Sequence, residues 1–564
     1  MAKIDVRNGY YGIVSYDKNG KEKCFTKKGK AINLDTILIN IENNDIIWEV
    51  SFNYKGRVVP IKFARENIGD RASIKTLVKN GADITPQNIN IAISSIMIQE
   101  DNVDNVISIY ENIGWRNIST NEHISKYVYR AHSLIGDNGE YHGNYQLKPM
   151  GSLEGWREMI INEVLGRPAL EVITLASLSA VVNGLISSHT TGENPIFHIN
   201  APTGTGKSSV GFVAASVFGE PFDGCKVVYD LNGNPKEAKS IYGSWAATPN
   251  AVIRTHIGNR GAVIILNELG KFESDDLTSI TYCLSEGTDK NRLNEKYQSF
   301  VGEGFSTSII SIGESSMVQR CKTREGGIDI RVMEIEDKLT ESPEHSRRLK
   351  DGSRKNNGWA ASALAQFIID NGGLNSVLDI YHNTLEELSV DVVDTSKHRF
   401  IEKYTALLIT TAKLSTMALK IDFNTQSVID FCDSYWEKKN AENYGVHKSF
   451  FEVLEDCDIN KCNFYDDSAR SYIPKLMWGK IFHPNTISNG KKLVAEYAIM
   501  PSTLRELLGN HGYNNPSTYL KKWRECGVLD CDEKHLTNKR IIDNSSKQQR
   551  VYVLQLWEEI SEDA

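Results

Sequence analysis

The sequence predicts a multidomain α/β protein, and patterns in successive segments support this prediction. Residues 1–150 alternate turn signals with β-type runs and include helical patterns, which is typical of an α+β domain. From 151 to 345, two leading helical patterns precede short apolar strands that alternate with helices, which indicates an α/β core. The segment 346–455 is predicted to be largely helical. A winged helix is predicted at 490–564, after a less regular segment at 455–489 that is expected to be a flexible join.

The elements of the N-terminal domain follow from local signals. Strands are expected at 10–16, 45–52 and 58–63, each next to a turn signal, and helices at 72–80 and 85–99. The domain holds no cluster of catalytic residue types. It is therefore expected to be a collar or docking module.

Composition and charge restrict the possible functions. The 564 residues carry a net charge of −8, so any DNA contact must come from local basic patches. The first residues lack the apolar region of a signal peptide, and nine scattered cysteines suit reduced thiols in the cytoplasm. The most apolar stretch, 169–186, contains Glu171 and Asn183. It is expected to be a buried core helix rather than a membrane span.

Two cysteine pairs share one spacing, Cys457 with Cys462 and Cys526 with Cys531. This spacing allows a zinc site, but four intervening residues are loose for a zinc knuckle. Ordinary thiols are the preferred interpretation.

A glycine-rich loop is the strongest motif in the core. An apolar strand at 195–200 runs directly into this loop, and a helix follows through residue 218. This is the context of a P-loop, whose backbone N–H groups surround phosphates at a helix N-terminus. Lys207 is expected to reach the β- and γ-phosphates of ATP, and Ser208 to supply a hydroxyl to Mg2+. The predicted cofactor-binding residues here are Ala201, Pro202, Thr203, Gly204, Thr205, Gly206, Lys207, Ser208 and Ser209.

A second apolar strand, 262–266, ends in Asn267 and Glu268, where ATPases of this kind usually carry Asp-Glu. Glu268 is expected to orient the attacking water. Asn267 occupies the position of the acid that steadies Mg2+, but its amide offers the metal only a carbonyl oxygen. It is still predicted to face the metal. The alternative is a core strand with a polar turn, which the P-loop upstream makes the weaker interpretation.

A third strand, 308–314, lies where a sensor group is expected. Ser311 or Glu314 is predicted to contact the γ-phosphate or the water, and a plain strand-end role explains either equally well. Between the second and third strands, a basic hairpin is predicted to enter a central DNA channel, with solvated loop charges as the alternative. Its predicted DNA-binding residues are Lys290, Arg292 and Lys296.

Three arginines are candidates for contacts to the nucleotide. Arg331, expected in the middle of a strand at 326–335, is the first candidate for an arginine finger that acts across a subunit boundary. Arg324 is the reserve. Arg399, which opens a predicted helix, is a weaker candidate for a second sensor contact. The predicted catalytic residues are Lys207, Glu268 and Arg331.

The C-terminal segment predicts a helix-turn-helix with a basic second helix. Helices are expected at 502–508 and 517–526, with Pro516 at the first helical position, and wing strands at 528–531 and 550–556. Such a helix meets duplex phosphates, and the alternative is a packing domain with a solvated basic face. The predicted contacts are Lys521, Lys522 and Arg524, beside wing residues Lys534, Lys539, Arg540 and Lys547.

Together these motifs resemble the AAA+ ATPases, and within them the self-loading, MCM-like replication helicases of staphylococcal pathogenicity islands and chromosomal cassettes. The resemblance covers roughly residues 100–440. It implies a hexameric ring, 3′-to-5′ unwinding of DNA, origin recognition and loading without a separate loader. Asn267 departs from the family pattern. The residues that carry the resemblance are Gly151 to Trp156, the P-loop with Ala215 to Pro221, Ser244 to Thr248, Tyr282, Glu286, Gly287, Lys290 and Arg292, Ser311 to Glu314, and Gly327 with Arg331.

The sequence therefore predicts an ATP- and Mg2+-dependent DNA helicase that replicates a mobile element. Its expected partners are single-stranded DNA in the channel, duplex origin DNA on the winged helix and further copies of the chain, with no membrane. One alternative is an AAA+ initiator that melts or marks an origin without translocating. The other is a non-motor DNA-binding switch, against which Glu268 and Arg331 argue.

Overall fold

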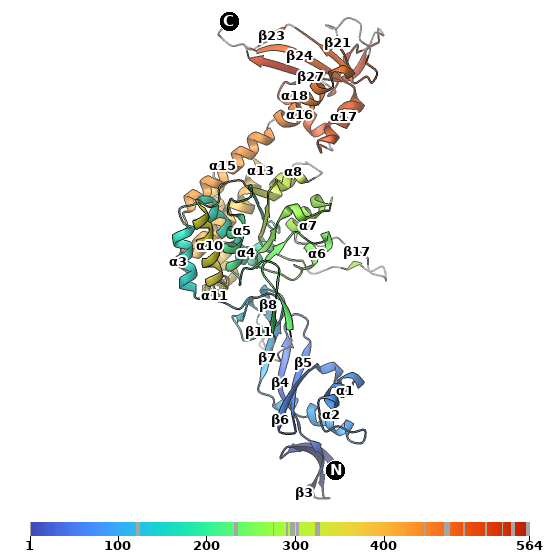
Figure 1. The fold of residues 1–564 in the computed structure, drawn as a ribbon, viewed down its shortest axis with the longest axis vertical. Helices are drawn as coiled ribbons and strands as arrows, with labels where there is room; N and C mark the ends of the chain where they lie inside the picture. Colours follow the sequence, from blue (N-terminus) through green and yellow to red (C-terminus); the bar gives the residue numbers. More distant parts are fainter. Residues whose placement is uncertain are drawn as a thin grey trace.

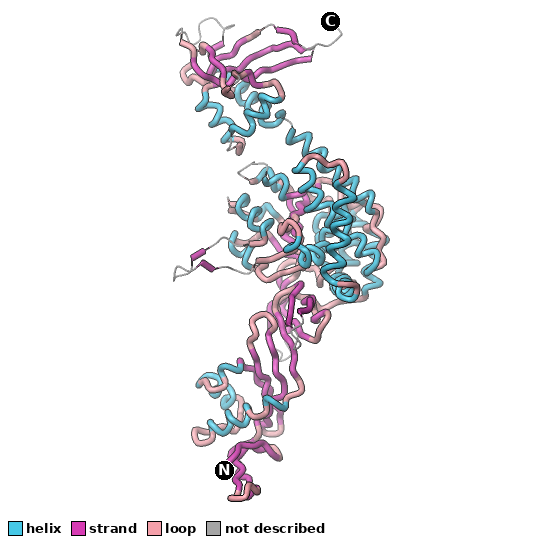
Figure 2. Tube along the Cα trace, turned by 180° about the vertical axis from the view of Figure 1, so that it is seen from behind, coloured by secondary structure: helices cyan, strands magenta, loops and turns pink. Residues whose placement is uncertain are grey.

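The computed structural model describes residues 2–559 apart from 120–124, 230–234, 275, 289–291, 294–298, 301–303, 322–326, 445, 467–473, 485, 489–490, 514–515, 533 and 543–546. The chain is elongated, with an N-terminal domain at one end, a large α/β domain in the middle and a small domain at the other end (Figure 1). The two termini therefore lie at opposite ends. Seen from behind, the long helices of the middle domain gather on one side of it and shorter helices lie on the other (Figure 2).

The N-terminal domain is built on a five-stranded sheet in the order β11-β7-β4-β5-β6. Trp48 and Val50 of its strand β5 are fully buried, in a core shared with α1 and α2. The strands and helices predicted here are confirmed. The elements are β1 (Ala2–Arg7), β2 (Tyr10–Tyr16), β3 (Glu22–Lys30), β4 (Ile32–Asn40), β5 (Ile46–Tyr54), β6 (Arg57–Ala64), η1 (Arg65–Asn67), α1 (Arg71–Lys79), α2 (Ile89–Met97), η2 (Glu100–Asn102), β7 (Val106–Tyr110), β8 (Gly114–Ser119), β9 (Ser125–Arg130), β10 (Leu134–Ile135) and β11 (Gly139–Tyr141).

Buried side chains of β8 and β9 fix this domain to the middle one. The Trp115 indole donates to the carbonyl of Val181, and the Tyr129 hydroxyl donates to the carbonyl of Gly261, at 2.7 and 2.9 Å. Arg130 is 2% exposed and forms an ion pair with Glu42. Burial without a partner would be costly for that guanidinium, so the pair holds it in place. From there Arg130 donates to the carbonyl of Gly258 in the middle domain at 3.1 Å.

The middle domain contains a five-stranded parallel sheet in the order β15-β16-β19-β12-β20. Strands β12, β16, β19 and β20 are buried on both faces, as expected for a parallel sheet covered on both sides. Alternate residues enter two separate cores: Phe197 and Ile199 face α4 and α5, whereas Ile196 and Val332 face α6 and α7. The elements are α3 (Leu153–Glu163), α4 (Pro168–Ile186), η3 (Ser187–His189), β12 (Ile196–Asn200), α5 (Lys207–Ser216), β13 (Cys225–Tyr229), β14 (Pro235–Lys239), β15 (Tyr242–Ser244), α6 (Pro249–Arg254), β16 (Ile264–Asn267), η4 (Leu269–Lys271), α7 (Leu277–Glu286), β17 (Arg292–Leu293), β18 (Ser299–Phe300), β19 (Ile309–Gly313), α8 (Met317–Arg320), α9 (Gly327–Arg331) and β20 (Val332–Ile335).

The apolar helix α4 is the centre of this domain. It is long and apolar enough to cross a membrane, but it is entirely buried inside the protein. It starts at Pro168, which suits the first helical position because that residue needs no N–H partner. The prediction of a buried core helix is confirmed.

The strand predicted at 326–335 is wrong in its first half. Residues Gly327–Arg331 form the short helix α9, and the strand begins only at Val332. The alternation of apolar and polar residues suggested a longer strand. However, Ile328 and Arg331 are three residues apart and share one helix face, where Ile328 is buried and Arg331 lies over Tyr282 of α7.

A layer of helices follows the sheet and packs against α4 and α5. One turn, Ile401–Thr405, is π-helical and joins α13 to α14. The elements are α10 (Pro343–Lys355), α11 (Ala360–Asp370), α12 (Gly373–Ser389), α13 (Thr395–Phe400), the π-helical turn η5 (Ile401–Thr405), α14 (Ala406–Leu419) and α15 (Thr425–Tyr444).

The C-terminal domain has one core of helices and strands. Helices α17 and α18 and strands β25 and β27 lie where the sequence predicts them. The core also takes Phe450, Val453 and Phe464, so the domain begins before residue 490, and 455–489 is largely part of it rather than a join. The elements are α16 (Val446–Ile459), η6 (Lys461–Asn463), β21 (Phe464–Asp466), β22 (Gly479–Phe482), β23 (Thr486–Ser488), β24 (Lys491–Ile499), α17 (Pro501–Asn510), α18 (Pro516–Glu525), β25 (Leu529–Asp530), β26 (Asn538–Arg540) and β27 (Gln549–Glu559).

Candidate active site

The carboxyl ends of three adjacent strands bring the main predicted site residues to one edge of the parallel sheet. In β12 and β19, Asn200 pairs with Gly313, so the glycine-rich loop and Glu314 follow side by side. In β16 and β19, Leu266 pairs with Ser311, so Asn267 and Glu268 follow at the same edge. Ligands of open α/β sheets bind at this edge.

The glycine-rich loop has the backbone that a phosphate site requires. Gly204 and Gly206 have φ values of +85° and +92°, which glycine adopts without strain. A Cβ at Gly206 would lie 2.4 Å from Cγ2 of Thr340, so only glycine fits there. Thr340 also donates to the carbonyl of Thr205 at 3.1 Å. Thr340 is thus a supporting residue that no motif marks, because it lies far along the sequence.

Lys207 begins α5 with its ammonium turned back onto the loop. Nζ donates to the carbonyls of Ala201 and Pro202, the latter at 2.8 Å, and lies 3.8 Å from Oε1 of Glu314. Burial lowers the pKa of Lys207, and the nearby Glu314 carboxylate raises it. The cation is therefore held beside the loop by two carbonyl oxygens and a nearby carboxylate.

The two serines after Lys207 differ in what they face. Ser208 is exposed at the start of α5, as a metal-side hydroxyl requires. Ser209 is buried, and its hydroxyl lies 2.8 Å from that of Ser346 in α10. The predicted role of Ser209 is therefore corrected: its side chain attaches α10 to α5 and does not face the loop.

Glu268 stands directly after β16 in a strained conformation. Its φ and ψ are +61° and +63°, a left-handed geometry that costs a non-glycine residue about 1–3 kcal/mol. The turn is stabilised by Arg320, which donates to the carbonyls of Leu269 and Phe272 at 2.7 and 3.0 Å. The Glu268 carboxylate is half-exposed and forms an ion pair with Lys271. Such strain is typical of residues that must present a side chain in one direction.

Asn267 precedes Glu268 and ends β16. Its carbonyl accepts from the backbone N–H of Trp245 at 2.9 Å, and the residue is half-buried. Asn267 thus ends β16 at the sheet edge, directly before Glu268.

Of the two sensor candidates, only Glu314 reaches the loop. The Thr203 hydroxyl donates to Glu314, whose side chain is 66% exposed. Ser311 is fully buried, and its hydroxyl is held by His198 at 2.9 Å and by the indole of Trp245 at 3.0 Å. The nucleotide contact predicted for Ser311 is therefore wrong, because its hydroxyl is committed inside the sheet.

Arg331 lies at the opposite edge of the sheet, immediately before β20. Its neighbour Val332 pairs with Ile196 at the start of β12, whereas the glycine-rich loop follows the end of β12. The four steps of that strand alone separate the two ends by about 13 Å. Arg331 therefore does not face the loop of its own chain.

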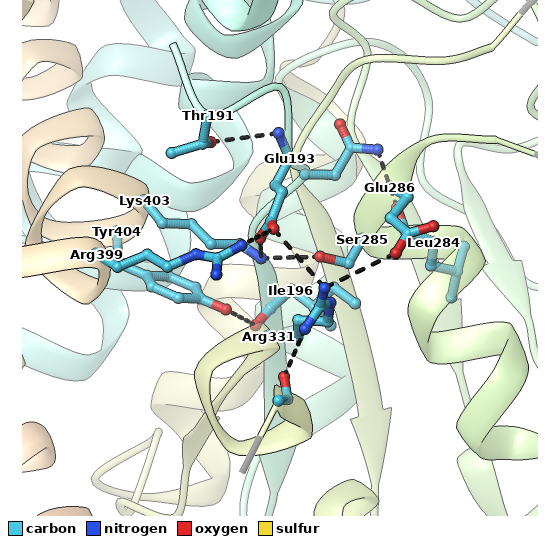
Figure 3. A network of polar contacts seen from close by, with 12 residues as sticks. Thr191, Glu193, Ile196, Leu284, Ser285, Glu286, Arg331, Arg399, Lys403 and Tyr404 are labelled. Carbon is cyan, nitrogen blue, oxygen red and sulfur yellow. Dashed lines mark hydrogen bonds and ion pairs between the residues drawn. The ribbon is translucent and has the colours of Figure 1, made fainter. Parts of the chain in front are cut away.

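Arg399 is near Arg331 rather than near the loop. Both approach Glu193, which precedes β12, and Lys403 of the π-helical turn joins them (Figure 3). Glu193 and Lys403 escaped prediction because no local motif marks them. The second sensor contact predicted for Arg399 is thus not supported within this chain.

Several predicted residues lie outside what the structure describes. They are the reserve arginine Arg324 and the hairpin residues Lys290 and Lys296. Arg292 belongs to β17, which pairs with β18 in a hairpin that extends away from the middle domain (Figure 1).

The basic residues of α18 are presented outward. Leu520 and Trp523 are buried, and the Trp523 indole donates to the Ser449 hydroxyl of α16 at 3.1 Å. This leaves the other face of α18 exposed. The exposed cations on it are Lys521, Lys522 and Arg524.

The wing is less basic than its sequence suggests. Arg540 forms an ion pair with Asp530, and Arg550 with Asp532 at 3.0 Å. Lys534, Lys539 and Lys547 are exposed.

Cys457 is buried in the core of this domain, and burial raises the pKa of its thiol. Among the described residues, no group of three His, Cys, Asp or Glu side chains is placed to hold a metal.

Comparisons with known proteins agree with this architecture. The model of the family described as "Domain of unknown function (DUF927)" matches residues 10–298. The chain belongs to the DUF927 family. Residues 446–559 match the Cch helix turn helix domain, so the C-terminal domain of this DUF927 protein is of the helix-turn-helix type.

One solved structure shares the whole fold. It is described as "SCCmec type IV Cch - active helicase" and is 19% identical, with a TM-score of 0.71. The match covers 97% of this chain and 96% of that chain. At this identity the likeness concerns the fold. No curated protein matches the chain.

Proposed function

We propose that this DUF927 protein is an ATP-hydrolysing DNA helicase of the AAA+ kind. It works in the cytoplasm as a hexameric ring, moves 3′-to-5′, and recognises origin DNA during replication of a mobile element. The helicase with the same fold and the helix-turn-helix domain support this proposal. The sheet order supports it too, since β19, the expected sensor strand, lies between β12 and β16.

One observation carries the proposal: the candidate catalytic residues are divided between two opposite edges of one sheet. Lys207 and Glu268 share one edge, and Arg331 lies at the other. A single chain cannot bring Arg331 to its own loop. A neighbouring copy can, so the division fits a site that is completed between subunits.

The residues at the loop edge fit ATP with Mg2+. A Cβ at Gly204 would meet nothing within 4 Å, and Ser208 is exposed beside it. Bound Mg2+ would neutralise charge on the phosphates. Lys207 would leave its carbonyl partners to hold the β- and γ-phosphates, Ser208 and Asn267 would hold the metal, and Glu268 would orient the water for attack. Glu314 is close enough to Lys207 to act as the sensor.

Asn267 and Glu268 should have separable roles. An amide places only a dipole near the metal, so Asn267→Asp should lower the Mg2+ concentration for half-maximal ATPase by roughly threefold or more. Glu268→Gln should slow hydrolysis by about 100-fold or more with ATP binding preserved. Mg2+ titrations of ATPase rate and nucleotide-binding measurements check both. If Asn267→Asp leaves the Mg2+ curve unmoved, Asn267 lies away from the metal.

The exposed face of α18 is proposed to contact duplex phosphates. Replacing Lys521, Lys522 and Arg524 with Ala should weaken duplex binding and flatten the slope of log affinity against log salt by up to about 3, because each phosphate contact contributes about 0.9. Basal ATPase should be unchanged. Lys491→Ala with Lys492→Ala, at the exposed start of β24, is the matched control. Equal salt slopes for both variants would contradict the assignment.

The decisive experiment combines a DNA-stimulated ATPase assay with strand displacement on duplexes carrying a 3′ or a 5′ single-stranded tail. A 3′-to-5′ motor shows stimulated ATPase and unwinds the 3′-tailed substrate. An initiator hydrolyses ATP with little processive unwinding. A DNA-binding switch shows neither activity. Electron-microscope images of particles with DNA and an ATP analogue test the ring.

A further inference from the structure

The cluster around Glu193 is the most concentrated charge network among the described residues outside the loop edge (Figure 3). Glu193 is 11% exposed, and both of its carboxylate oxygens are used. Arg399 donates to one oxygen, and Lys403 donates to the other at 2.8 Å. Lys403 also donates to the Ser285 hydroxyl at 2.8 Å. Two cations from the helical layer are thus fixed on one acid that precedes β12.

Arg331 lies beside this cluster but makes no hydrogen bond to Glu193 or Glu286. Its Nη2 lies 3.9 Å from Glu193 and 3.7 Å from Glu286, beyond hydrogen-bond distance. Among the described residues its guanidinium makes one hydrogen bond, from Nη1 to the carbonyl of Gly327 at 2.9 Å. The buried Nε has no partner, and the group lies over the Tyr282 ring at 4.5 Å. Nη2 therefore keeps unused donors on a planar cation, which suits an incoming anion.

The balance of acids and cations around Arg331 keeps its guanidinium in this position. Three cations, Arg331, Arg399 and Lys403, meet two acids, Glu193 and Glu286, and Glu286 is half-exposed. Burial alone would raise the pKa of Glu193, but the three cations lower it overall. The carboxylate is therefore ionised at neutral pH. Without its charge, the two cations of the helical layer would repel Arg331.

The placement of Glu193 and Lys403 is specific. The next residue, Asn194, is fixed by donation to the carbonyl of Leu284 at 2.9 Å and by acceptance from the N–H of Thr307 at 2.8 Å. Lys403 reaches Glu193 from the π-helical turn, a rare geometry that often marks functional positions. The acid and its cations are thus held by rigid elements on both sides.

We infer that Glu193 is a positioning residue for the trans-acting Arg331: it offsets Arg399 and Lys403, so that Arg331 waits with free donors for the phosphates on a neighbouring subunit. This inference rests on the proposed function. Glu193 itself does not contact the nucleotide. Loss of its charge should impair the neighbour's hydrolysis, not ATP binding by its own chain.

The test uses rings of wild-type subunits mixed equally with labelled subunits that carry Lys207→Ala and therefore contribute no hydrolysis. The added subunits are Lys207→Ala alone, Lys207→Ala with Arg331→Ala, or Lys207→Ala with Glu193→Gln. In an equal mixture about half of the wild-type loops face a variant subunit. Only the wild-type subunits hydrolyse ATP. A fall in their ATPase therefore measures how well the variant subunit presents Arg331 to its neighbour. Labelled subunits verify equal incorporation.

The expected order separates the two hypotheses. The Arg331→Ala series should show about half of the ATPase of the Lys207→Ala series. The Glu193→Gln series should lose most of the same amount of ATPase. If the first two series coincide, the trans site of the proposed function fails. If they differ while the Glu193→Gln series matches Lys207→Ala, only the role of Glu193 is overturned.

A matched control excludes a general effect of losing a buried carboxylate. Glu163 is 16% exposed and forms an ion pair with Arg348 at 2.8 Å, away from the cluster. Lys207→Ala with Glu163→Gln should match Lys207→Ala in mixed rings. If Glu193→Gln fails to assemble, Glu193→Asp, which keeps the charge, takes its place in the third series and should assemble. The ATPase of this series should exceed that of the Arg331→Ala series by more than half of the difference between the first two series. An ATPase equal to that of the Arg331→Ala series would overturn the inference.

Discussion

Replacing Lys207 with Ala should abolish measurable ATP hydrolysis and DNA unwinding while the fold survives. The ammonium at the start of α5 rests on the carbonyls of Ala201 and Pro202, within the glycine-rich loop. Loss of one such preorganised charge costs about 100- to 1000-fold in rate. The side chain is partly exposed and anchors no core, so the free energy of unfolding should change little.

ATPase rates, strand displacement and thermal unfolding check this prediction together. Lys62→Ala is the matched control, because Lys62 lies in β6 of the N-terminal domain and pairs with Glu49 at 3.4 Å. The control should keep full activity. A folded Lys207→Ala protein with wild-type ATPase would remove the loop from the mechanism altogether.

Local signals were enough to predict the features that short segments determine. The strand β12, the loop and α5 follow one another in sequence, and the two glycines need only their own φ values. The buried helix α4 was evident from an apolar run interrupted by few polar residues. Likewise, Pro516 begins α18, and the apolar spacing of that helix fixes which face carries its cations.

Contacts between distant residues explain what the sequence could not reveal. Ser311 looked like a sensor at a strand end, but His198 and Trp245, 113 and 66 positions away, hold its hydroxyl inside the sheet. Arg399 and Lys403 lie 206 and 210 positions from Glu193. No spacing rule connects such residues, because only the folded sheet and helical layer bring them together.

The same topology relates the two edges of the sheet. Glu193 precedes β12 and the glycine-rich loop follows it, so one short strand joins the cluster around Arg331 to the nucleotide edge of the same chain. In a ring, each subunit would then present its finger to one neighbour and its loop to the other. A point mutation at either edge should therefore produce a defect that depends on which neighbour is intact.

Arg331→Ala should bind ATP normally yet hydrolyse it about 1000-fold more slowly or worse, the loss expected when an arginine finger is removed. An arginine finger stabilises charge that develops in the transition state rather than bound ATP itself, so nucleotide affinity should stay within about twofold. Steady-state ATPase rates and equilibrium binding of a fluorescent ATP analogue measure the two quantities separately. Arg331→Lys keeps a charge without the planar fork and should recover only part of the rate.

Complementation decides whether Arg331 acts between subunits. Mixing Arg331→Ala subunits with Lys207→Ala subunits should restore part of the ATPase, because some interfaces then combine an intact loop with an intact finger. Arg65→Ala is the control arginine: Arg65 binds Glu100 at 2.6 Å in the N-terminal domain and should leave hydrolysis unchanged. Restoration that rises and falls with the mixing ratio is the signature of a shared site. If no ratio restores activity although both variants assemble together, Arg331 stabilises its own chain through Tyr282 and Gly327 and is not a finger.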